Sequence, residues 1–336
     1  MSLNSLEEIA SYIVSDGKGI LAADESNPTC TKRFDTIGVE STEESRRDYR
    51  EMLFTSGALQ DNIGGVILFD ETIRQHAKDG TSLVEIMNSH GALPGIKVDK
   101  GLQPIGESEE TVTVGLDGLD ERLKEYFELG AKFTKWRAVI KIGNNMPTDH
   151  CIDANMKALA DYAKIVQDNG MVPMVEPEVL MEGSHSIDDC FEATDRSLKS
   201  LFHYLNKNEV NIKGTILKPN MVTAGATCSH QASINEVAQR TLDCLKANIP
   251  SELPAITFLS GGQSELLATA HLDAMNKIGG FNWKLSFSYG RALQAPTLKA
   301  WMGKPENVFI AQDALSHRAK MNKLAALGQW NEGLED

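Results

Sequence analysis

The segment GTILK, residues 214–218, decides the fold, because a short apolar run ends there in a lysine followed by Pro219. Short runs rich in Val, Ile, Leu and Phe are typical of buried parallel strands. Seven further runs of this kind are Gly19–Ala23, Gly65–Phe69, Gly95–Val98, Phe133–Arg137, Val172–Val175, Ala255–Leu259 and Lys284–Ser288. Segments of helical period separate them, and the alternation predicts an α/β fold, a single closed (β/α)8 barrel.

Local signals predict where several helices begin and end. Ser41 with Glu44, and Ser233 with Glu236, have the spacing of capping boxes. Gly170 is placed to end a helix over Cys151–Asn169. Additional helices are expected over Ser5–Val14 and between Leu293 and Leu327. No linker or low-complexity tract divides the chain, so residues 1–336 are expected to form one domain.

Composition excludes several classes of partner. The chain has 33 Lys and Arg against 47 Asp and Glu, a formal net charge of −14. Nucleic acid and anionic membranes both require a basic surface, so neither is an expected partner. Met1 to Ile9 lacks the basic-then-apolar pattern of a signal peptide, and there is no long apolar run and no CxxC among the five cysteines. We therefore expect reduced thiols in the cytoplasm. An anionic substrate would need a local cationic pocket.

Motifs for the common cofactors are missing from the sequence. Asp24-Glu25-Ser26 follows the first run, where a dinucleotide-binding strand would carry GxGxxG, and no GxxxxGK[ST] loop occurs. The eight histidines form no HxH or HxxxH pair and none lies at the end of a run. We therefore expect neither a cofactor nor a catalytic metal.

Charged residues gather at the ends of the runs, where barrel enzymes carry their active sites. They are Asp24, Lys97, Asp99, Lys100, Lys135, Arg137, Glu176, Glu178, Lys218 and Arg291. Buried charges of alternating sign can bring a lysine pKa into a catalytic range. Such a lysine can attack a ketone and form an iminium, which accepts electrons when a neighbouring C–C bond breaks.

Two glycine loops follow the last two runs, where barrels commonly bind phosphate. Glycine lets backbone N–H groups approach an anion closely, and an arginine adds a bidentate contact. The loops are Ser260-Gly261-Gly262-Gln263 and Ser288-Tyr289-Gly290-Arg291.

The sequence resembles the class I, Schiff-base-forming fructose-1,6-bisphosphate aldolases from Gly17 to about Lys323. The matching blocks occur in the same order and are long: GKGILAADES, GGVILF, GIKVDKG, GLDGL, FTKWR, VPMVEPE, KGTILKPNMVT, TFLSGGQSE and FSYGRALQ. The resemblance implies reversible cleavage of fructose 1,6-bisphosphate to dihydroxyacetone phosphate and glyceraldehyde 3-phosphate.

The resemblance also implies residue roles. Lys218 would form the Schiff base, Glu176 would act as acid and base, and Glu178 would be its hydrogen-bonded neighbour. Asp24 would contact the C4 hydroxyl, and Lys135 would steer protonation. The C1 phosphate would bind Ser260, Gly261, Gly262, Ser288, Gly290 and Arg291. The C6 phosphate would bind Ser26, Arg33, Lys97 and Arg137.

Two departures from the family pattern leave questions open. Asn27-Pro28-Thr29 replaces a Thr-Gly-Ser-like turn, and Pro28 is expected to stiffen that loop. Animal-type relatives end in a tyrosine that assists proton transfer at C3, whereas no tyrosine follows Tyr289 here. Either another residue moves that proton, such as Glu176 through water, or the step is slow.

Alternative functions follow from the same residues. The main substrate could instead be sedoheptulose 1,7-bisphosphate or fructose 1-phosphate, or the chain could be a non-catalytic scaffold. The family also implies a homo-oligomer, with a tetramer favoured and a dimer compatible.

Overall fold

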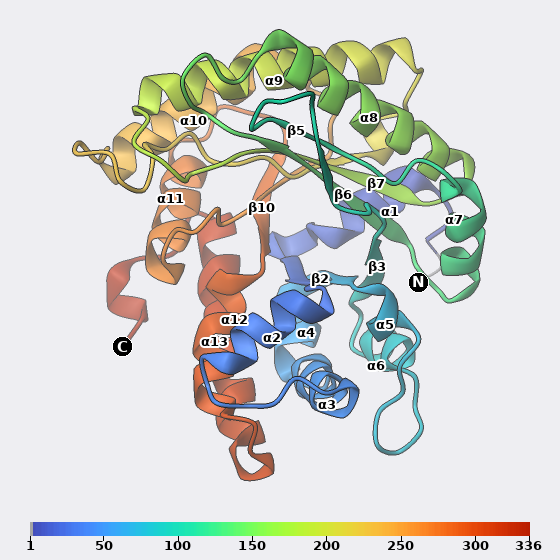
Figure 1. The fold of residues 1–336 in the computed structure, drawn as a ribbon. Helices are drawn as coiled ribbons and strands as arrows, with labels where there is room; N and C mark the ends of the chain where they lie inside the picture. Colours follow the sequence, from blue (N-terminus) through green and yellow to red (C-terminus); the bar gives the residue numbers. More distant parts are fainter. Residues whose placement is uncertain (1–2) are drawn as a thin grey trace.

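Eight parallel strands form a closed barrel in this computed structural model, which describes residues 3–336 (Figure 1). Their order around the barrel is β1-β10-β9-β8-β7-β6-β3-β2. Their bounds are β1 Gly19–Ala23, β2 Ile63–Leu68, β3 Leu93–Lys97, β6 Phe133–Ile140, β7 Val172–Val179, β8 Ile216–Leu217, β9 Ala255–Phe258 and β10 Lys284–Tyr289. The predicted barrel is confirmed.

Some strand ends differ from the prediction. β6 continues to Ile140 and β7 to Val179, beyond Arg137 and Val175, where the expected runs stopped. The residues added to β7 include Glu176 and Glu178, which line the barrel cavity and hid the strand pattern, whereas those added to β6 are apolar. A small antiparallel hairpin, β4 (Leu102–Pro104) with β5 (Thr111–Thr113), was not expected, since its strands are only three residues long.

The helices flank the barrel, with α8 to α10 on one side and α12 and α13 beside α2 to α4 on the other (Figure 1). Their bounds are α1 Leu6–Ile13, α2 Asn27–Asp35, α3 Glu43–Phe54, α4 Gly57–Asn62, α5 Asp70–Ile73, α6 Leu83–Ser89, α7 Leu119–Glu128, α8 Asp149–Asp168, α9 Ile187–Lys207, α10 Ile234–Asn248, α11 Glu265–Ile278, α12 Arg291–Trp301 and α13 Val308–Ala326.

The predicted helix ends are partly right. Ser233 caps α10 by accepting the N–H of Glu236, and Gly170 follows α8 with a φ of 73°. The box expected at Ser41 is wrong by one residue, because Thr42 caps α3 and exchanges hydrogen bonds with Ser45. The helix expected from Cys151 begins two residues earlier, at Asp149.

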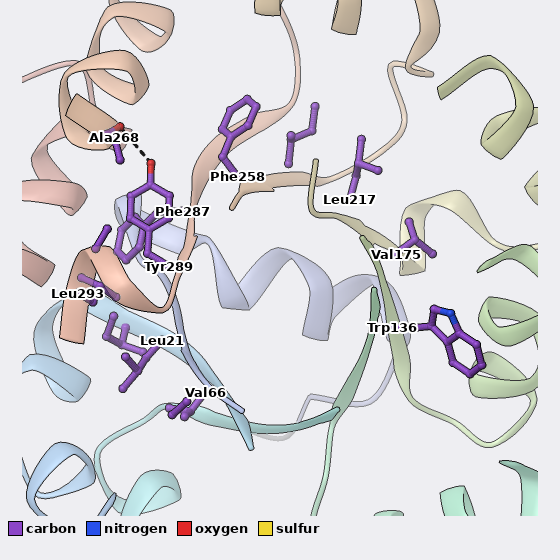
Figure 2. Packing of buried hydrophobic residues seen from close by; sticks show 14 of the residues in the cluster. Leu21, Val66, Trp136, Val175, Leu217, Phe258, Ala268, Phe287, Tyr289 and Leu293 are labelled. Atoms are coloured by element: carbon purple, nitrogen blue, oxygen red, sulfur yellow. Dashed lines mark hydrogen bonds between the residues drawn. The ribbon is translucent and has the colours of Figure 1, made fainter. Parts of the chain in front are cut away.

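Alternate residues of each strand pack into two separate apolar layers. Figure 2 shows the outer layer, in which side chains from the strands face the surrounding helices. The outer residues include Leu21, Val66, Trp136, Val175, Leu217, Phe258, Phe287 and Tyr289. The inner layer contains Ile20, Ile67, Phe133, Val172, Met174, Ile216 and Ala255.

Helix α1 closes one end of the barrel. Its Ile9, Ala10 and Ile13 belong to the inner apolar layer, and a Cβ on Gly64, near the start of β2, would lie 2.0 Å from the Ile13 carbonyl oxygen. The inner layer therefore fills the end at which the strands begin. Polar chemistry is confined to the opposite end.

Candidate active site

A cavity of about 310 Å³ opens at the carboxyl ends of the strands. Every predicted site residue except Gly262 lines it: Asp24, Ser26, Arg33, Lys97, Lys135, Arg137, Glu176, Glu178, Lys218, Ser260, Gly261, Ser288, Gly290 and Arg291. Gly262 lies just behind, where an added Cβ would come within 3.5 Å of the Arg291 guanidinium. Residues from seven strands or the loops after them thus meet in one place.

Strand register brings the charged residues together. Lys97 on β3 is opposite Lys135 on β6, and Arg137 is opposite Glu176 on β7. Val175 is opposite Leu217, so Glu176 and Lys218 are the next pair along β7 and β8. Because inward residues alternate, Phe133 fills the apolar layer of β6, and Lys135, two residues later, reaches the cavity.

Four side chains form a continuous ionic chain at the centre of the cavity. Glu176 lies between two lysines, with Oε1 3.1 Å from Lys218 Nζ and Oε2 3.3 Å from Lys135 Nζ. Asp24 Oδ2 lies 2.7 Å from Lys135 Nζ. Lys135, Glu176 and Lys218 are each about 4% exposed, so these contacts are poorly screened by solvent.

These ionic contacts shift the pKa values of the side chains that form them. Burial raises the pKa of Asp24, but Lys135 and Lys218 outweigh burial and lower the pKa below its usual value. The same balance lowers the pKa of Glu176. Burial lowers the pKa of Lys135, but Asp24 and Glu176 together raise it above the usual value for lysine. For Lys135 this direction contradicts the expectation that the cluster brings lysine pKa values down.

One end of the cavity is built from the loops after β9 and β10, and we call it the glycine end (Ser260–Gly262 and Ser288–Arg291). Gly261 and Gly262 have φ values of 59° and 92°, which favour glycine. Within residues 3–336 nothing accepts a hydrogen bond from either N–H. Helix α12 begins here at Arg291 without a side-chain cap, so no side chain accepts a hydrogen bond from its first N–H groups.

Side chains at the glycine end are also without internal partners. The Ser288 hydroxyl is buried, and it has no hydrogen-bond partner in the described part of the chain. Arg291 forms no ion pair with any carboxylate of residues 3–336. Unused donors, a helix N-terminus and a guanidinium together make an anion site.

A second part of the cavity carries more cations, each of which pairs with a carboxylate, and we call it the paired end (Ser26, Arg33, Lys97 and Arg137). Of these, Arg33 adjoins the glycine end, since an added Cβ on Gly290 would lie 3.7 Å from its guanidinium. Arg33 pairs with Glu25, and Arg137 pairs with Glu178. Lys97 Nζ lies 3.3 Å from Asp99 Oδ1. Ser26 shares a 3.1 Å hydrogen bond with Thr29.

Comparison with known proteins identifies the family. The sequence profile described as fructose-bisphosphate aldolase class-I matches residues 5–336. A probable fructose-bisphosphate aldolase class 1 from Xanthomonas axonopodis pv. citri is 54% identical over 332 residues, 98% of this chain and 99% of that protein. The chain belongs to the class I fructose-bisphosphate aldolases. Fructose-bisphosphate aldolase 4, cytosolic, of Arabidopsis thaliana is 52% identical over 95% of this chain and 82% of its own.

A solved structure agrees with this assignment. Fructose-bisphosphate aldolase from Plasmodium falciparum, in complex with TRAP and a small molecule inhibitor, superposes with a TM-score of 0.96 at 46% identity. The match covers 98% of this chain and 95% of that one. The chain is therefore a lyase that cleaves fructose 1,6-bisphosphate, and class I members need no metal ion. The resemblance inferred from the sequence blocks is confirmed.

Glu25 is the main site residue that the sequence reasoning did not select. It pairs with Arg33 and also with Arg50, whose Nη2 lies 3.1 Å from Glu25 Oε2. Gln294 donates to Glu25 Oε1 at 2.8 Å. Glu25 adjoins Asp24 in the AADES block, which was the available signal, but its partners on α3 and α12 are distant in sequence.

The predicted stiff loop at Pro28 is instead the first turn of α2. Ser26 is the N-cap, and Pro28 lies in the first turn of the helix. An N–H group at that position would have no acceptor within the helix, so proline is tolerated there. Thr29 lines the cavity beside Ser26.

Histidines lie outside the cavity, as expected, but two are buried. Neither ring nitrogen of His185 has a hydrogen-bond partner in the described chain, and His271 contacts Gln263. No group of three or more His, Cys, Asp or Glu residues between 3 and 336 is arranged to hold a metal ion. No helix in the same range is long and apolar enough to cross a membrane.

Proposed function

We propose that Lys218 is the residue that forms the Schiff base with the C2 ketone of fructose 1,6-bisphosphate. One observation distinguishes Lys218 from Lys135, the other buried lysine that contacts Glu176. Lys135 is held by two carboxylates, Asp24 and Glu176, and its pKa is raised, so it remains an ammonium ion. Among residues 3–336, Lys218 pairs with one carboxylate, Glu176, rather than with two.

Glu176 is placed to move protons during Schiff-base formation. The Lys218 amine attacks C2, and the proton that its nitrogen then releases moves to the former carbonyl oxygen, giving a carbinolamine. Glu176, having accepted a proton from Lys218, returns one to the C2 hydroxyl, which leaves as water and gives the iminium. Lys135 stays positive on the other side of Glu176, which favours the return of Glu176 to the carboxylate.

Asp24 is placed to assist cleavage. Its lowered pKa keeps it ionised, so it can accept the proton of the C4 hydroxyl as the C3–C4 bond breaks. The electrons of that bond move into the iminium and leave an enamine on Lys218, while C4 becomes the aldehyde of the first product. Glu178, paired with Arg137, borders this region and would orient Arg137 toward the substrate.

The two ends of the cavity suit two phosphates. We assign the C1 phosphate to the glycine end, where the donors have no partner among residues 3–336. The C6 phosphate would lie at the paired end, near Ser26, Arg33, Lys97 and Arg137. Sedoheptulose 1,7-bisphosphate and fructose 1-phosphate would share the Schiff-base half and differ at the paired end. A purely scaffolding role is disfavoured because every reactive group meets in the cavity.

The test replaces Lys218 by methionine, which keeps the side-chain length and removes the amine. We expect kcat for fructose 1,6-bisphosphate to fall by more than about 10⁴-fold, since the covalent path is lost. Lys199→Met, at an exposed helix pair with Asp195, is the control and should keep wild-type activity. EDTA should leave the wild type unchanged. Substantial activity in Lys218→Met would refute the assignment.

We also propose that the protein works in the cytoplasm as a single-domain homo-oligomer. Relatives named cytosolic support the location, and the family supports a tetramer, with a dimer as the alternative. Sedimentation equilibrium distinguishes these: four times or twice the 36.8 kDa chain mass supports the proposal, and a monomer contradicts it.

A further inference from the structure

His271 is a buried histidine outside the cavity that contacts the loop of the glycine end. It lies on α11, is 2% exposed, and its Nδ1 is 2.6 Å from Gln263 Oε1. Gln263 is the residue that follows Gly262. The ring is therefore only one side chain away from the loop proposed to bind the C1 phosphate.

The contact defines the state of the ring. An amide oxygen can only accept a hydrogen bond, so His271 Nδ1 is the donor. His271 Nε2 is buried and has no hydrogen-bond partner in the described chain, so it is left as the bare nitrogen of a neutral ring. Burial lowers the pKa of His271 to about 4, which agrees with a neutral ring at physiological pH.

Gln263 connects His271 to the loop of the glycine end. With its oxygen held by His271, its amide nitrogen faces the other way and donates to the Ser260 carbonyl at 3.0 Å. The Gln263 backbone N–H donates to the same carbonyl at 3.0 Å. The amide nitrogen also lies 3.6 Å from Met221 Sδ, three residues after Lys218. A single amide thus ties the turn around Gly261 and Gly262 to the segment that carries Lys218.

We propose that His271 is a positioning residue that holds Gln263, and through it the Ser260–Gly262 turn, in the conformation that binds the C1 phosphate of the substrate. Both glycines have positive φ values, a region that glycine leaves readily, so the turn needs an external restraint. Without the His271 donor, the Gln263 amide is free to rotate, and its hydrogen bond to the Ser260 carbonyl is no longer held in place. This inference rests on the proposed phosphate site.

The experiment compares three substitutions that affect the hydrogen bond between His271 and Gln263 differently. His271→Leu removes the donor and keeps an apolar filling. His271→Asn keeps an N–H donor close to the position of Nδ1, since the first atoms of the two side chains match. Gln263→Met removes the amide contacts with His271, Ser260 and Met221 at similar side-chain length, and it replaces His271→Leu if that variant does not fold. Met275→Ala is the matched control, because Met275 is buried one turn further along α11 and lies outside the loop.

Steady-state cleavage of fructose 1,6-bisphosphate is measured with inorganic phosphate as a competing probe. His271→Leu and Gln263→Met should raise both KM and the phosphate inhibition constant by roughly five- to tenfold, as for one lost hydrogen bond. Their kcat should change by less than about twofold, because His271 and Gln263 do not touch the reacting atoms. His271→Asn should restore both constants, whereas Met275→Ala should lower the melting temperature and leave both constants unchanged.

Each contrary outcome has a distinct meaning. Unchanged constants in folded His271→Leu and Gln263→Met, or equal increases in Met275→Ala, would overturn the positioning role. Failure of His271→Asn to restore binding would overturn the hydrogen bond as its cause. If inorganic phosphate does not inhibit the wild type, the phosphate site itself is wrong, whereas Lys218→Met tests the Schiff base separately.

Discussion

The glycine end and the paired end of the cavity both face an anionic substrate, but they are prepared for it differently. At the glycine end, the Ser288 hydroxyl and Arg291 have no internal partners among residues 3–336. At the paired end, Lys97 already pairs with Asp99, and Arg33 pairs with Glu25, a carboxylate that it shares with Arg50. A phosphate therefore gains new contacts at the glycine end, whereas at the paired end it must compete with carboxylates. We infer that the glycine end supplies most of the binding free energy.

Replacing Arg291 by alanine should produce the largest change. It removes a charge-assisted contact at the glycine end, which is worth about 1.5–3 kcal/mol, so KM should rise roughly 10- to 150-fold. Because both substrates carry the C1 phosphate, fructose 1,6-bisphosphate and fructose 1-phosphate should be affected equally. Steady-state kinetics with both sugars measure this. A loss confined to the bisphosphate would place Arg291 at the other phosphate.

Acid should weaken the structure behind the glycine end. The pKa of His271 is lowered to about 4 by burial, so between about pH 4 and 6.5 the unfolded chain binds a proton that the folded chain does not. This contribution to stability is complete above pH 6.5 and falls with acidification, by about 2 kcal/mol between pH 7 and pH 5. Denaturant unfolding at both pH values should show a smaller acid loss in His271→Asn. Equal losses in both proteins would contradict the buried neutral ring.

Replacing Lys97 by methionine should have a smaller and selective effect. The substitution removes a cation from the paired end but leaves the carboxylate of Asp99, so the C6 phosphate binds less well. We expect KM for fructose 1,6-bisphosphate to rise about tenfold, within the range for a hydrogen bond to a charged group. Fructose 1-phosphate should be unaffected, which narrows the difference in kcat/KM between the sugars. Equal effects on both would remove the distinction between the ends.

The smallest effect is expected from Tyr289→Phe. The Tyr289 hydroxyl donates to the Ala268 carbonyl at 3.1 Å and ties β10 to α11 behind the glycine end (Figure 2). Its loss should reduce the free energy of unfolding by about 1 kcal/mol. The ring stays in the outer apolar layer, so KM should not change. A raised KM would indicate that this tie also positions the phosphate loop.

The barrel and the inward-facing charges could be predicted because they depend on local patterns. Each strand alternates with period two, so the spacing of Lys135 and Arg137 already places both on one face. The glycine end follows from two contiguous loops. The end of β7 could not be predicted, because Glu176 and Glu178 interrupt the apolar run that marks a buried strand.

The ion pairs at the paired end could not be predicted from the sequence, for a different reason. Glu25 meets Arg50 across 25 residues and Gln294 across 269, contacts that exist only once α3 and α12 pack beside β1. The direction of the Lys135 pKa shift likewise depends on two carboxylates from β1 and β7 converging on a single amine. Composition predicts that charges meet but does not say which of them pair.

The most direct test of the account is to locate the covalent intermediate. Wild-type protein is incubated with dihydroxyacetone phosphate, reduced with borohydride, and mapped by peptide mass spectrometry. We predict irreversible inactivation with one adduct per chain, on Lys218, and none on Lys135, because its two carboxylates keep it protonated. An adduct on Lys135, or no adduct on either lysine, would contradict the assignment of Lys218.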